Sequence, residues 1–161
     1  MSIPSWRAAL KDPDPSDPLT DLLAKYTPEM AAAARAILDK MRARLPGAVE
    51  LVYDNYNALV VGFGPSERSS DTVFSIAIYP GRINLVFLRG ARLPDPDHLL
   101  TGSGRSARHI PLMGPSMLDA PAVRTLMEHA LKHAAHPFDP TQPRRTIIRS
   151  ISTKQRPRRP R

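Results

Sequence analysis

The sequence predicts an α+β fold, a two-layer domain in which an antiparallel meander sheet of about five strands carries its helices on one face. Three observations predict this fold class. Apolar residues recur at helical spacing near both ends of the central region, and between these ends they alternate with a period of two. The connections between the alternating segments are short, which favours antiparallel neighbours. Hydrophobic residues make up 42% and charged residues 24%, which is typical of a folded globular protein.

Two helices are predicted before the strands. Leucines and a tyrosine at helical spacing indicate a short amphipathic helix over residues 19–26. A longer helix follows over residues 27–45, because Thr27 is a suitable N-cap and Pro28 fits the first helical position. The Pro-Gly pair at 46–47 ends this helix.

The strands are predicted from residues that are rich in β-branched and aromatic types and alternate in polarity. Four such segments are residues 48–54, 57–63, 72–79 and 83–89. Asp54 and Asn55 favour a hairpin turn between the first two, and the Pro-Gly pair at 80–81 suits a tight turn between the last two. Residues 107–112 indicate a fifth strand at a sheet edge, because Pro111 cannot donate a hydrogen bond to a central ladder.

A last helix is predicted with Asp119 as its N-cap and Pro121 in its first turn. An apolar stripe runs along it from Val123 to Ala134. Helices on one face leave the other face of the sheet open, and an open sheet face is a place where a partner can bind.

The net charge of +8 is concentrated at the C-terminal end. Residues 137–161 contain eight lysine and arginine residues and one aspartate, so the rest of the chain is nearly neutral. A nucleic-acid footprint over the whole domain is therefore not indicated. The expected organisation is an extended N-terminal segment over 1–18, an α+β domain over 19–136, and a basic Pro/Arg-rich tail over 137–161 with one candidate strand.

Several function classes are excluded or disfavoured by composition. The 161 residues include no cysteine, which excludes disulfides, thiolate metal ligands and a cysteine nucleophile. No apolar run approaches the length of a membrane span, and the N-terminus lacks the apolar core of a signal peptide, so we expect a cytoplasmic protein with no membrane partner. No nucleotide fingerprint and no nucleophile–base spacing is present, which predicts no cofactor and no catalytic residue.

The stretch GSGRSARHI, which begins at Gly102, is the main candidate site. Gly102 and Gly104 allow positive φ angles that turn backbone amides toward an anion. Arg105 and Arg108 could pair with a phosphate or carboxylate, and His109 is a further donor. The alternative is a flexible surface turn whose arginines face water.

Tyr53, Asp54 and Tyr56 are additional candidates for the same ligand site, at the border of the open sheet face. The alternative for these residues is a hairpin turn flanked by tyrosines, because Asp and Asn are common in turns.

A metal site is a further hypothesis. His129, His133 and His136 fall at i, i+4 and i+7 of the last helix, a spacing that could place three imidazoles along one side. The alternative is a set of surface histidines at a helix C-terminus, where positive charge is favourable.

The tail RRTIIRSISTKQRPRRPR supports two more hypotheses. TIIRSIS predicts a strand that is added to a sheet edge, either in the same chain or in a second copy, which would give a dimer. The basic end with Arg156, Arg158 and Arg159 could bind nucleic acid without sequence preference. The oligomeric state is left open.

Three segments carry a resemblance to a known family: VYDNYNALVVGFGPSE, YPGRINLVFLRGARLPDPDHLLTGSGRSARHI and IIRSISTKQRPRR. They resemble the YdhG-like family, a bacterial family catalogued as a domain of unknown function. The resemblance implies a small cytosolic α+β domain with a meander sheet, a tail strand that is part of the fold, and a basic end after it. Some members of the wider family are described as frataxin-like iron chaperones, which implies a metal-binding alternative with Asp95, Asp97, His129 or His133 as ligands.

Taken together, these patterns favour a non-catalytic ligand-binding or accessory domain with an anion site in the loop 102–109. The alternatives are a frataxin-like metal-binding chaperone and a nucleic-acid-binding accessory that acts through the basic tail. Whether the protein is an enzyme is left open, although no residue spacing indicates one.

Overall fold

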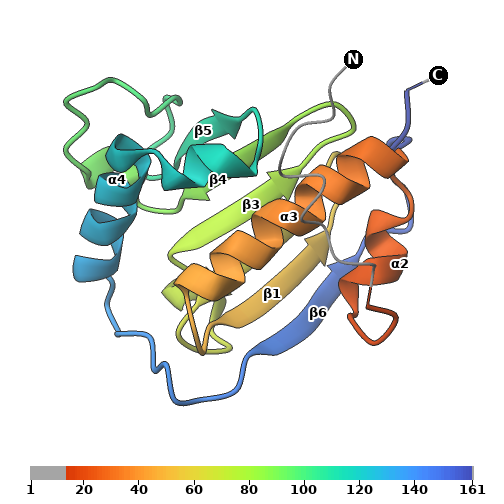
Figure 1. Cartoon of the computed structure of the whole chain (residues 1–161), viewed down its shortest axis with the longest axis horizontal. Helices are drawn as coiled ribbons and strands as arrows, with labels where there is room; N and C mark the ends of the chain where they lie inside the picture. Colours follow the sequence, from red (N-terminus) through yellow and green to blue (C-terminus); the bar gives the residue numbers. More distant parts are fainter. Residues whose placement is uncertain (1–13, 161) are drawn as a thin grey trace.

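A six-stranded sheet lies at the centre of the computed structural model, which describes residues 14–160 (Figure 1). Its strands are β1 (Val49–Asp54), β2 (Leu59–Gly64), β3 (Phe74–Ile78), β4 (Ile83–Phe87), β5 (Arg108–Leu112) and β6 (Arg145–Ile151). The helices are α2 (Leu19–Leu23), α3 (Pro28–Arg44) and α4 (Pro121–Lys132), and the 3-10 helices are η1 (Ser69–Asp71), η2 (Gly90–Arg92) and η3 (Pro115–Asp119). Most of the predicted N-terminal segment 1–18 and the last tail residue, Arg161, lie outside the described residues.

The predicted α+β class with a mainly antiparallel sheet is confirmed. The strands lie in the order β5-β4-β3-β2-β1-β6, and every pair from β1 to β5 is antiparallel. The sixth strand is the candidate strand of the tail, which pairs parallel to β1 of the same chain. The tail therefore contributes an edge strand to the sheet of its own domain.

The helices form where the sequence patterns predict them. The side chain of Thr27 caps α3 by accepting a hydrogen bond of 3.2 Å from the Met30 amide. At the turn between β1 and β2, the Asn55 amide donates to the Ala58 carbonyl at 2.9 Å.

The predicted N-cap of α4 is wrong by one residue. The helix begins after Ala120, which has no side-chain cap, and Asp119 instead ends η3. The Asp119 carboxylate is occupied by ion pairs with Lys40, Arg44 and Arg124, so it joins α4 to α3 rather than capping α4.

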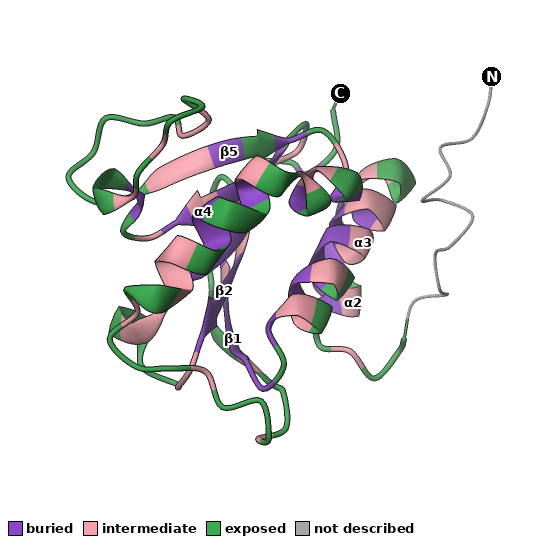
Figure 2. Cartoon of the chain, turned by 60° about the vertical axis from the view of Figure 1, so that its left-hand side comes forward, coloured by how far each residue is buried: buried purple, intermediate pink, exposed green. Residues whose placement is uncertain are grey.

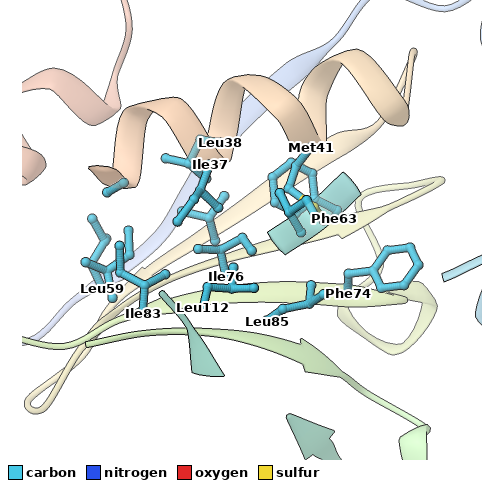
Figure 3. Packing of buried hydrophobic residues seen from close by; sticks show 14 of the residues in the cluster. Ile37, Leu38, Met41, Leu59, Phe63, Phe74, Ile76, Ile83, Leu85 and Leu112 are labelled. Atoms are coloured by element: carbon cyan, nitrogen blue, oxygen red, sulfur yellow. The ribbon is translucent and has the colours of Figure 1, made fainter. Parts of the chain in front are cut away.

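The core lies between the sheet and the helices. Rows of apolar residues cross the helix-facing side of the sheet in register, one of them through Val52, Val61, Ile76, Leu85 and Ile110. Side chains of α3 pack onto these rows (Figure 3). Full burial of one such side chain contributes about 1.5–3 kcal/mol, so this layer holds the helices on the sheet.

The helices of residues 14–160 cover one face of the sheet, and none of them covers the other face. In Figure 2 the buried residues of α3 and α4 face the sheet. The opposite face carries small residues at its centre, namely Gly62, Ser75 and Ala77.

None of the helices between residues 14 and 160 has the length and apolar character that a membrane span requires.

Candidate functional site

A pocket of about 600 Å³ lies where the end of β4, the loop that follows it and the C-terminal end of α4 meet. We call it the β4–α4 pocket. It is lined by Thr72, Val73, Phe87, Arg89, Arg92, Leu93, Ser106, Ala130, His133 and Ala134. Its volume is that of a site for a small molecule.

The lining of the β4–α4 pocket combines apolar side chains with basic ones. Phe87 and Val73 belong to the core and form apolar lining. Within the described chain, no hydrogen bond or ion pair engages the Arg92 guanidinium or the His133 ring, and the Arg89 guanidinium donates only to the Ser70 carbonyl, at 3.3 Å. Since none of the residues that line the pocket is acidic, the arrangement fits an anion that carries an apolar group.

The loop from β4 to β5 is fixed by its own hydrogen bonds. The Ser106 hydroxyl donates to the Leu88 carbonyl at 2.6 Å, and the Ala91 amide donates to the Ser106 carbonyl at 2.8 Å. A side chain at Gly90 would meet Arg108 Cβ at 2.7 Å, so only glycine lets η2 lie this close to β5. These contacts hold Arg89, Arg92 and Ser106 at the same pocket.

The predicted anion loop, residues 102–109, lies beside this pocket. Its glycines and arginines differ in backbone conformation and in hydrogen bonding. Gly102 has the expected positive φ, 133°, whereas Gly104 does not have one. Arg108 donates from Nη1 to the Gly104 and Ala107 carbonyls at 2.6 and 2.7 Å, so its guanidinium closes the loop on itself. Arg105 is exposed.

His109 lies on β5 and lines a different groove. Its backbone exchanges two hydrogen bonds of 2.9 Å with Thr101, which anchors the base of the loop. Its side chain borders an open groove on the sheet face opposite α3 and α4, together with Tyr79, Arg82 and Asn84. Of the residues 102–109, only Ser106 lines the β4–α4 pocket.

Tyr53, Asp54 and Tyr56 lie far from the loop, because β2, β3 and β4 separate β1 from β5 in the sheet. The two residues Tyr53 and Asp54 point to opposite faces, as neighbours on a strand do. Tyr56 is 54% exposed in the turn after β1. The structure therefore does not bring this group together with Gly102 and Arg105.

The candidate metal ligands are also separated. Asp95 accepts hydrogen bonds from the Leu99 and Leu100 amides at 2.8 and 2.9 Å, which gives it a role in the turn. His129 lines a small cleft with Asp95 and Asp97, whereas His133 lines the β4–α4 pocket. In the described range 14–160, no three or more His, Asp or Glu side chains form a group that could hold a metal ion.

The tail is anchored at Arg158, which is one of the predicted nucleic-acid-binding residues. The Arg158 side chain is 2% exposed and pairs with Asp54, with 2.8 Å between Nη2 and Oδ1. Lys25 also pairs with Asp54 at 2.7 Å. Arg158 is therefore not available at the surface, whereas Arg156 and Arg159 on either side of it are exposed.

The ion pairs of Asp54 predict an acid-labile fold. Burial opposes ionisation of Asp54, but hydrogen bonds from Lys25 and Arg158 outweigh it, so the pKa of this carboxyl lies below its usual value. The pKa of Asp17 is lowered in the same way against burial, through the Leu19 amide and Arg42. Because the folded state binds these protons less readily than the unfolded chain, the stabilisation is complete above the unfolded pKa of about 4 and is lost as the pH falls through the lower folded pKa.

We therefore expect the free energy of unfolding, measured in urea between pH 7 and pH 2.5, to fall as the pH decreases below about 4. In Asp54→Asn the decrease should be shallower, because one of the carboxyls with a lowered pKa is gone. A wild-type free energy that stays constant down to pH 2.5 would contradict this prediction.

Comparison with protein-family models, with curated proteins and with solved structures finds no match to this chain. The resemblance to the YdhG-like family therefore stays a prediction.

Sequence reasoning missed Arg89, Arg92 and Ser106 as residues of one pocket. The RGAR segment from Arg89 to Arg92 carried a signal, since two arginines three residues apart in a 3-10 turn lie on the same side. The contribution of α4 had no local signal, because it depends on how the helix packs.

Proposed function

We propose that this protein binds a small anionic molecule with an apolar group in the β4–α4 pocket, without catalysing a reaction. The observation that carries the proposal is that three basic residues, Arg89, Arg92 and His133, line the same pocket as the apolar side chain of Phe87. Arginine pairs well with phosphate and carboxylate oxygens, and a pocket that is partly closed to water strengthens such pairs. The loop 102–109 takes part as one wall of the site, through Ser106.

Phenyl phosphate is a suitable probe because it combines an anion with an apolar ring. It should raise the melting temperature of the protein more than inorganic phosphate or phenol at the same concentration, since each of these offers only half of the interaction. Isothermal titration calorimetry then gives its dissociation constant.

Arg92→Ala should weaken phenyl phosphate binding by about tenfold to a hundredfold, because a hydrogen bond to a charged group contributes about 1.5–3 kcal/mol. Arg105→Ala is the matched control, since Arg105 is an exposed arginine on the same loop that does not line the pocket. Equal affinities for wild type and Arg92→Ala, or a loss only in Arg105→Ala, would contradict the proposal. The second result would favour the tip of the loop as the site.

A further inference from the structure

A second cluster of basic and aromatic residues lies at the other end of the β3–β4 hairpin. The Arg82 guanidinium lies over the Tyr79 ring, 4.3 Å from its centroid. Arg82 is exposed, and no ion pair or hydrogen bond to its side chain is found between residues 14 and 160. The stacked pair presents a flat, charged surface, and guanidinium planes are surfaces on which nucleobases stack.

Two grooves meet at this stacked pair. One, of about 500 Å³, is lined by Tyr79, Pro80, Gly81, Arg82, Arg156, Pro157, Arg159 and Pro160. The other, of about 370 Å³, is lined by Tyr79, Arg82, Asn84, Val86, Ala107, Arg108, His109 and Pro111. Neither lining contains an acidic residue, so the surface repels cations and favours a polyanion.

An unsatisfied polar group in the second groove indicates a ligand. Asn84 is 6% exposed, and its Oδ1 has no hydrogen-bond partner in the described part of the chain. A buried oxygen without a partner is unfavourable, and most such atoms in folded proteins are satisfied. A nucleobase edge that offers an N–H group would satisfy it, since an asparagine amide pairs well with the hydrogen-bonding edge of a base.

The anchoring of the tail explains why its arginines face the first groove. Arg158 is buried against Asp54, and the Arg156 amide donates to the Tyr56 carbonyl at 2.8 Å. These contacts fix the backbone on both sides of Arg156, whose guanidinium has no partner within residues 14–160. Arg159 lines the same groove as Arg156, and its guanidinium donates hydrogen bonds to the carbonyls of Ala24 and Lys25.

We propose that the Tyr79–Arg82 pair, Asn84 and Arg156 bind single-stranded nucleic acid. A base stacks on the Arg82 plane with its edge toward Asn84, and Arg156 pairs with an adjacent phosphate. The site lies apart from the β4–α4 pocket, with which it shares no lining residue, and it does not depend on the proposed function.

The test is fluorescence anisotropy with a labelled ten-nucleotide thymidine strand at low salt, using the full chain. Arg82→Ala and Tyr79→Ala should each weaken binding by about tenfold, which is the effect expected from the loss of one stacked base. Arg156→Ala should lower the slope of log affinity against log salt by about 0.7, the value for one phosphate of a single strand. An abasic strand of equal length should bind wild type as weakly as the normal strand binds Arg82→Ala.

Two control variants make the result specific. Arg68→Ala removes an exposed arginine of the β2–β3 loop, and Arg92→Ala alters the β4–α4 pocket; both should leave strand binding unchanged. Absence of strand binding by wild type, or equal weakening by Arg68→Ala and Arg82→Ala, would overturn the proposal. Displacement of the strand by thymidine monophosphate at equal nucleotide concentration would also overturn it, in favour of a free-nucleotide site.

Discussion

Arg158→Ala is expected to lower the free energy of unfolding by about 3–5 kcal/mol, although Arg158 lies close to the end of the chain. Its guanidinium donates to Asp54 Oδ1 at 2.8 Å, to the Tyr56 carbonyl at 3.0 Å and to the Asn55 carbonyl at 2.5 Å. Asp54 is 1% exposed, and removal of Arg158 leaves this buried carboxylate with Lys25 as its remaining ion-pair partner. Loss of one partner of a buried pair is costly because the other charge stays out of water.

The measurement is urea unfolding followed by circular dichroism at pH 7. A loss of this size should also lower the melting temperature by roughly 6–20 °C for a chain of this length. Arg156→Ala is the matched control, since Arg156 is exposed and two residues away; its effect should stay within about 0.5 kcal/mol. A loss below about 1 kcal/mol in Arg158→Ala would show that the tail is not held by this ion pair.

A double variant separates the penalty for an unpaired charge from the value of the pair itself. Arg158 Nε is buried without a partner, so the pair is not fully satisfied. Replacing both members, as in Asp54→Asn with Arg158→Met, should therefore cost less than the sum of the two single replacements. Additive losses would mean that the two side chains act independently.

The patterns of the sequence predicted the antiparallel part of the fold well, because each of these strands pairs with its neighbour along the chain. The alternation around Val52, Val61 and Ile76 identifies the helix-facing side, and short turns then determine the pairing. The position of β6 could only be left open. A strand that follows a helix and pairs parallel to β1 depends on long-range contacts that no local pattern contains.

The sequence of β1 does contain one signal for these long-range contacts. Glu50 and Asp54 alternate with apolar residues on the same face of β1 as Val52, which places two carboxylates in the core. Buried carboxylates require cationic partners, and lysine and arginine residues are most concentrated in the tail. Asp54 was instead predicted as a turn or ligand residue, because its sequence context, DN, is also typical of hairpins.

The β4–α4 pocket was predictable only in part. The glycines and arginines of the loop after β4 predict a candidate site there, but which arginine lines the pocket depends on local hydrogen bonds. Arg108 donates hydrogen bonds to the carbonyls of Gly104 and Ala107, whereas Arg92 lines the pocket together with His133, the C-cap residue of α4. The orientation of each arginine depends on packing between elements that are far apart in the sequence, and no residue spacing in a single sequence predicts that packing.

The second large effect on stability is expected at Glu50, which contacts the N-terminal end of the tail strand β6. Glu50→Ala is expected to lower the free energy of unfolding by about 3–5 kcal/mol. Glu50 is fully buried and accepts hydrogen bonds from Arg42 Nε and Nη2 at 2.7 and 2.9 Å, and from the Thr146 hydroxyl of β6 at 2.9 Å. Its removal takes the closest partner from Arg42 and leaves a cavity in the core, and both effects destabilise the folded state.

Glu67→Ala is the matched control for this prediction, because Glu67 also pairs with an arginine of β6, Arg145, but at the surface. Exposed pairs of this kind contribute at most about 1 kcal/mol. Hydrogen exchange distinguishes a local from a global effect. If Glu50 holds β6 on β1, the amides of β6 should lose protection in Glu50→Ala to a greater extent than those of β3. Equal losses in Glu50→Ala and Glu67→Ala would instead mean that burial gives the Glu50 contacts no special strength, and that β6 is held by its backbone ladder alone.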